Sequence, residues 1–147
     1  MEAIITIISA ALAVASALFS VFTYYKTVSH DRKQATLEAY NRLQTEVFDK
    51  FNLITKKQIK EISDNPRSDE YKNLSKLLAR IEHFCVGVNT GIYDVDVVER
   101  LGGKYFLGVY EKSRPLIDKK RDINKTANHY DEFELMIEKL RERYSKR

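Results

Sequence analysis

The chain begins with an unbroken stretch of apolar and small residues and continues with apolar residues that recur at helical spacing. Residues 3–25 contain no charge, no proline and no glycine. A helix over this stretch spans about 34 Å, which is enough to cross a hydrocarbon core of about 30 Å. The pattern therefore predicts a transmembrane anchor over residues 1–25, although its small residues from Ala15 to Ala17 also fit a signal-peptide cleavage site. We favour the anchor, because no basic residue precedes the stretch and it stays apolar through Phe22.

The flanks of this apolar stretch predict its orientation. Tyr24 and Tyr25 close it, as aromatic residues do at membrane interfaces, and basic residues such as Lys26 and Lys33 follow. The preceding flank offers only the α-amino group and Glu2. Because basic flanks favour the inside, we expect a single-pass protein of the cell membrane with its N-terminus outside and its C-terminus in the cytoplasm.

The remaining residues, 26–147, carry a helical pattern throughout and predict one cytosolic α-helical domain. Apolar residues spaced by three and four predict a long helical stalk from about 31 to 62, and whether the anchor continues unbroken into it stays open. Turn residues at 63–68 and 91–94 and the pair Gly102 and Gly103 divide the rest into further helices, and Pro115 must either kink its helix or begin a new segment. No alternating strand pattern competes. The predicted fold is all-α: a single N-terminal transmembrane helix followed by a cytosolic helical bundle of about five helices.

The segment from Ser68 to Thr90 is the most informative of these helices. One face is strongly apolar, and Ala79, His83 and Val86 give the opposite face a partly apolar character, so we expect a central helix. Within it we single out five candidate structural or interaction positions: Arg80, Glu82, His83, Gly87 and Gly91. We expect Arg80 or Glu82 to pair with another helix, Gly87 to permit close packing, and Gly91 to end the helix in the left-handed conformation.

The evidence for a catalytic or metal site in this helix is weak. His83 and Cys85 lie about 160° apart around a helix, so one helix cannot bring them together. The three histidines lie on separate segments, too few for a metal site. We therefore expect no catalytic residue, no cofactor and no metal, and we interpret His83 and Cys85 as structural. A hydrolytic site built on Glu82, His83 or Asp94 is the competing interpretation.

The net charge and its distribution along the chain argue against a nucleic acid as partner. The chain has 25 Lys and Arg against 21 Asp and Glu, a net charge of +4, and acids interleave with the basic residues. This excess predicts mild attraction to anionic lipid, and we expect no nucleic-acid partner. The lone cysteine agrees with a reducing cytoplasm.

Two runs, Asn65–Ser68 and especially Ala79–Asp94, resemble a bacterial family of domains of unknown function with one N-terminal membrane helix and a helical cytosolic domain. The resemblance implies that architecture and a prokaryotic or prophage origin, and it implies no activity. The leading hypothesis is a membrane-anchored, non-enzymatic interaction module or scaffold at the cytoplasmic face of a bacterial membrane. Its partners would be the lipid bilayer and a protein partner or a second copy of the chain.

An alternative hypothesis is an oligomerising membrane effector, for example in phage defence, that perturbs the bilayer. Ser9, Ala13 and Ala17 repeat at four-residue spacing in the apolar stretch. Small residues on one face let two helices approach closely in lipid.

Overall fold

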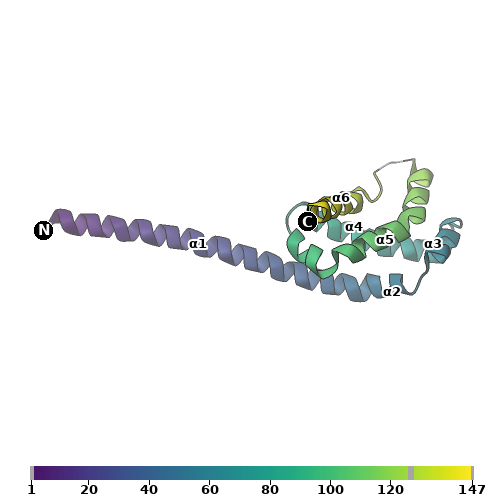
Figure 1. Ribbon diagram of the computed structural model, residues 1–147, viewed down its shortest axis with the longest axis horizontal. Helices are drawn as coiled ribbons and strands as arrows, with labels where there is room; N and C mark the ends of the chain where they lie inside the picture. The colour runs from purple at the N-terminus through teal and green to yellow at the C-terminus, as the bar shows by residue number, and fades with distance from the viewer. Residues whose placement is uncertain (1, 126–127, 147) are drawn as a thin grey trace.

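The computed structural model describes residues 2–125 and 128–146, and the regular secondary structure of these residues is helical throughout, which confirms the all-α class (Figure 1). The elements are α1 (Glu2–Leu43), the π-helical turn η1 (Gln44–Phe48), α2 (Asp49–Asn52), α3 (Lys56–Ser63), α4 (Asp69–Asn89), α5 (Val95–Asn124) and α6 (Asp131–Ser145). The first three run on as one helix from Glu2 to Asn52, so the apolar stretch enters the bundle without a break.

This first helix has two halves with different surroundings. Its N-terminal half projects away from the other helices in Figure 1, and every side chain from residue 6 to residue 28 is exposed. The first buried side chain is Thr36, and burial then follows one face through Tyr40, Leu43 and Phe51. Only the second half of the helix belongs to the bundle.

The core of the bundle lies around Phe106 of α5. Its ring contacts four other rings, with centroid distances of 6.2 Å to Tyr40, 5.1 Å to Phe48, 5.7 Å to Phe84 and 6.4 Å to Phe133. Edge-to-face and stacked pairs at these separations add attraction beyond simple burial. Phe106 thus ties the first helix, α4 and α6 together.

The predicted stalk over residues 31–62 is wrong at its end, because the helix stops at Asn52 and α3 starts at Lys56. Thr55 caps α3: its hydroxyl accepts a hydrogen bond from the Gln58 amide at 3.2 Å, and the Gln58 side chain accepts one from the Thr55 amide at 2.8 Å. This reciprocal capping box satisfies two free helix-end donors, which favours a new helix over continuation. Leu53, in the break, is exposed.

The breaks predicted near Gly102 and Pro115 have different outcomes. Gly102 has non-helical backbone angles and marks a kink within α5, as the sequence predicts. A Cβ at Gly102 would overlap the Tyr40 hydroxyl, so the kink also lets α5 approach the first helix closely. Pro115 starts no new segment and lies inside α5.

Candidate functional site

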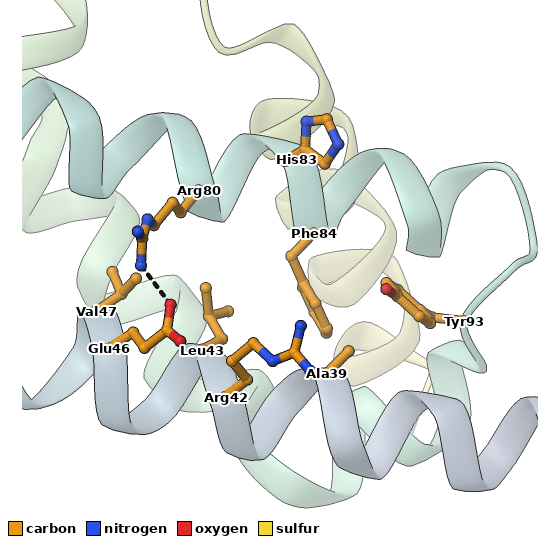
Figure 2. Close-up of a pocket in the computed structure, with 9 residues that line it drawn as sticks. All are labelled: Ala39, Arg42, Leu43, Glu46, Val47, Arg80, His83, Phe84 and Tyr93. Carbon is orange, nitrogen blue, oxygen red and sulfur yellow. Dashed lines mark hydrogen bonds and ion pairs between the residues drawn. The ribbon is translucent and has the colours of Figure 1, made fainter.

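An open groove of about 260 Å³ lies between the second half of the first helix and α4 (Figure 2). Ala39, Arg42, Leu43, Glu46 and Val47 line it from the first helix. Arg80, His83 and Phe84 line it from α4, and Tyr93, from the segment after α4, closes one end. It is the place where two of the five singled-out positions, Arg80 and His83, come together.

The π-helical turn η1 forms one edge of this groove. A π-helical turn holds an extra residue compared with an α-helical turn, which shifts the faces of the helix that follows. Consecutive residues Val47 and Phe48 are both buried here, where a regular helix would direct them about 100° apart. The turn thus places Val47 on the groove and Phe48 against the ring of Phe106.

The groove has an apolar floor and a charged rim. Leu43, Val47 and Phe84 are buried and form the floor, and the Arg80 guanidinium donates to the Glu46 carboxylate across the rim (Figure 2). The guanidinium of Arg42 makes no ion pair or hydrogen bond within residues 2–125 and 128–146. The rim of the groove therefore carries one guanidinium, that of Arg42, without an ion-pair partner among the described residues and next to apolar surface.

Tyr93 fixes the end of the groove. Its ring stacks on Phe84 with a centroid distance of 5.2 Å and occupies the space that a side chain at position 87 would need. Gly87 is therefore required for the seating of Tyr93 on α4. Gly91 has φ +80°, the left-handed conformation that the sequence predicts, and it turns the chain so that Tyr93 folds back onto α4.

Glu82 contacts another helix, but as a helix cap and not as an ion pair. Its two carboxylate oxygens accept hydrogen bonds from the backbone amides of Glu132 at 3.0 Å and Phe133 at 2.7 Å. These amides begin α6, whose own N-cap residue Tyr130 makes no side-chain cap in the described structure. Burial raises the pKa of Glu82, although both hydrogen bonds oppose that rise. A carboxylate here also complements the positive end of the α6 dipole.

The opposite face of α4 differs from its predicted role. Ala79, Arg80, His83 and Val86 are exposed, so α4 is buried on one face only and the expectation of two packed faces is wrong. The ring of His83 makes no hydrogen bond to any described residue and lines the groove instead. Cys85 is fully buried, and burial raises the pKa of its thiol well above the usual range. The structure does not bring these two side chains together.

Asp94, the alternative catalytic carboxylate, lies where the first helix meets the bundle. It caps α5 by accepting from the amides of Asp96 at 2.9 Å and Val97 at 3.3 Å, and Arg32 donates to it at 3.2 Å. Burial alone would raise the pKa of Asp94, but the two amides and the Arg32 guanidinium lower it. In the segments that the structure describes, no three His, Cys, Asp or Glu side chains gather as a metal site would require.

Fold and groove define an all-α protein with one N-terminal helix that is long and apolar enough to cross a membrane. The chain belongs to the family described as Domain of unknown function (DUF4760), whose pattern it matches over residues 7–140. That match includes most of the apolar stretch together with the bundle. No curated protein and no solved structure matches the chain.

Sequence reasoning missed Arg42, Glu46 and Tyr93 as residues of the groove. The helical spacing puts Arg42 and Glu46 on one face, four residues apart, so the pattern contained part of the signal. Nothing in the sequence indicated that this face lies beside Arg80.

Proposed function

We propose that the protein is a membrane-tethered, non-enzymatic interaction module at the cytoplasmic face of a bacterial membrane, which binds its partner in the groove between the first helix and α4. The observation that carries the tether is the exposure of large apolar side chains all around the helix over residues 6–25, including Phe19 at 71%. Soluble proteins rarely expose apolar surface on this scale. A bilayer accommodates it without any partner.

The unbroken helix supports a fixed placement of the bundle near the bilayer. Arg32, the first residue bonded to the bundle, lies seven helical steps after Tyr25, at the end of the apolar stretch. At about 1.5 Å per residue this is about 10 Å. The bundle would then stand at the membrane surface.

The groove supports a protein partner of defined chemistry. Arg42 is uncommitted, Arg80 shares its charge only with the exposed Glu46, and Phe84 and Tyr93 offer aromatic surface beside them. A partner segment that combines a carboxylate with an apolar side chain matches both features. Arginine and aromatic residues dominate the energy of many protein interfaces.

The tether is tested by placing two charges in the apolar stretch. Each arginine near the centre costs about 2.5–3.5 kcal/mol of insertion free energy, so Leu12→Arg with Val14→Arg should move the protein from the membrane fraction to the soluble or aggregated fraction. Leu53→Arg with Ile123→Arg is the matched control, because both residues are exposed but lie outside the stretch. Retention of the first double variant in carbonate-washed membranes would contradict the tether.

The groove is tested by charge reversal at Arg42. Photo-crosslinking from position 39, beside Arg42, should yield a defined adduct in cells, and Arg42→Glu should reduce it by at least about 30-fold, the effect of losing a hot-spot arginine. Arg67→Glu reverses an exposed charge outside the groove and should leave the adduct unchanged. Equal yields from both variants would refute the groove as the binding site.

The second candidate is the oligomerising membrane effector. The exposed small residues Ser9, Ala13 and Ala17 on the projecting half of α1 favour it, since no described residue of the same chain covers them. Induced expression of residues 1–62 should then depolarise cells, and Ala13→Leu should relieve the effect. A tethered module predicts no depolarisation.

A further inference from the structure

A second cavity, of about 580 Å³, lies beside the first half of α4, the end of α5 and the turn before α6. Tyr71, on its wall, stands 16 residues before Gly87 in α4, which is about 24 Å along a helix. The start of α4, which lines this cavity, lies at the end of the bundle away from the projecting half of the first helix (Figure 1).

Three hydroxyl groups line this cavity without firm partners. Tyr71 is 4% exposed, and Ser75 lies one turn further along α4. Apart from each other, these two hydroxyls have no hydrogen-bond partner among the described residues. The hydroxyl of Tyr130 also makes no hydrogen bond to a described residue, but unlike the hydroxyls of Tyr71 and Ser75 it is not fully buried. Burial, with Tyr71 and Glu82 nearby, raises the pKa of Tyr130 to about 12, so its phenol stays protonated and able to donate.

The charged groups of the cavity are mostly free cations. Lys120 of α5 places its ammonium 5.9 Å from the centre of the Tyr71 ring, and neither Lys120 nor Lys76 forms an ion pair within the described part of the chain. Lys72 pairs with Asp69 at 3.0 Å. Glu82 is the one carboxylate on the cavity wall, and both of its oxygens already accept hydrogen bonds from α6.

The geometry points to a binding site for a small soluble molecule that carries a phosphate or a similar oxyanion. We infer that Lys76 and Lys120 neutralise the oxyanion while the hydroxyls of Tyr71, Ser75 and Tyr130 donate to its oxygens. Buried donors left without acceptors cost free energy, and an oxyanion supplies several acceptors at once. The turn that forms one wall is already fixed, since Arg121 donates to the His129 carbonyl at 2.9 Å. This site is independent of the groove and of the tether.

The test uses the full chain in detergent micelles and inorganic pyrophosphate as the probe. Isothermal titration at constant ionic strength should show saturable binding. Lys120→Gln should weaken it by about tenfold, the loss expected for one charge-assisted hydrogen bond, and Tyr71→Phe by about fivefold. Lys120→Arg keeps the charge and should bind within about threefold of the original protein.

Lys60→Gln is the control, because Lys60 is an exposed lysine of α3 outside the cavity. It should bind pyrophosphate like the original protein. Absence of saturable binding, or equal weakening by Lys60→Gln and Lys120→Gln, overturns the proposal. If Lys120→Gln lowers the melting temperature, Lys76→Gln, on an exposed residue, replaces it in the same comparison.

A second arm separates a soluble ligand from a lipid headgroup. The chain is placed in nanodiscs of phosphatidylcholine alone or with phosphatidylglycerol, and pyrophosphate is titrated into each. Equal affinity supports a soluble ligand. Competition by phosphatidylglycerol would assign the cavity to lipid phosphate and overturn the assignment to a soluble molecule.

Discussion

The two halves of the first helix are both rich in large apolar residues, yet one is wholly exposed and the other contributes much of the core. Phe19 in the first half is 71% exposed, and Phe51 in the second is 0% exposed. In residues 3–25 apolar side chains surround the helix, whereas from Thr36 to Phe51 they occupy one face and charged residues the other. A helix apolar on all sides suits a lipid solvent, and a helix with one apolar face suits a protein core.

One continuous helix thus changes from a surface that is apolar on all sides to one with a single apolar face, because its sequence pattern changes along its length. No loop marks the change, and the backbone hydrogen bonds continue through it. Burial alone decides which half contributes to the stability of the bundle. The predictions below test that division.

Truncating a phenylalanine in each half should give the largest contrast. Phe51→Ala removes a fully buried ring and should lower the free energy of unfolding by about 3–5 kcal/mol. Phe19→Ala should change it by less than about 0.5 kcal/mol, as for other exposed positions. Urea unfolding in micelles, followed by tyrosine circular dichroism, measures both. Comparable losses would show that the apolar half also packs against the bundle.

Filling the kink beside the packed half should have the next largest effect. Gly102→Ala introduces a Cβ against the Tyr40 hydroxyl, which also donates to the Leu101 carbonyl at 3.4 Å, and overpacking of this kind costs about 1–3 kcal/mol. Gly108→Ala is the matched control, since a Cβ added there would meet no described atom within 4 Å apart from its chain neighbours and the backbone of its own helix. Alanine at this position should stabilise α5 by about 0.5–1 kcal/mol. The same unfolding assay should therefore show opposite signs for the two variants.

The junction between the halves should respond to pH. Arg32 and the α5 amides lower the pKa of Asp94 in the folded state, so its stabilisation is present above the unfolded pKa of about 3.9 and is lost as pH falls through the folded value. Asp94→Asn should cost about 1 kcal/mol at pH 6, where the hydrogen bond to a charged partner is lost. Because asparagine does not titrate, the gap between the two proteins should close as the pH falls below about 3.9 and through the folded-state pKa of Asp94. A gap that stays constant with pH would mean that the carboxylate charge contributes nothing.

The ion pair across the groove should give the smallest effect. Glu46 and Arg80 are both about half exposed, and such pairs contribute about 0.2–1 kcal/mol. Glu46→Gln, Arg80→Gln and the double variant form a thermodynamic cycle that measures the coupling. A coupling well above 1 kcal/mol would indicate that the groove is more enclosed than the exposed rim suggests.

Much of the fold follows from local rules. The apolar stretch, the left-handed Gly91, the break at Gly102 and the last helix were all readable from spacing and turn chemistry. The end of the first helix was also present in the sequence, as threonine and glutamine three residues apart, but a continuous apolar stripe masked it.

The candidate site was less predictable because it depends on contacts between distant segments. Glu82 caps a helix 50 residues away, and Arg80 meets Glu46 across 34 residues. The π-helical turn that sets the groove edge has no sequence rule of its own, because packing of Val47 and Phe48 stabilises it. The helical periodicity of a single sequence can be read directly, whereas contacts between residues far apart in that sequence cannot.

The unbroken passage of the first helix from the apolar stretch into the bundle makes the angular position of the groove a property of sequence length. Each residue added between Lys26 and Asp31 would turn the bundle by about 100° around the helix axis and lift it by about 1.5 Å. Seven added residues, close to two full turns, would nearly restore the original heading while moving the bundle outward by about 10 Å. The number of residues in that short segment thus sets the direction in which the groove faces relative to the projecting half of the first helix.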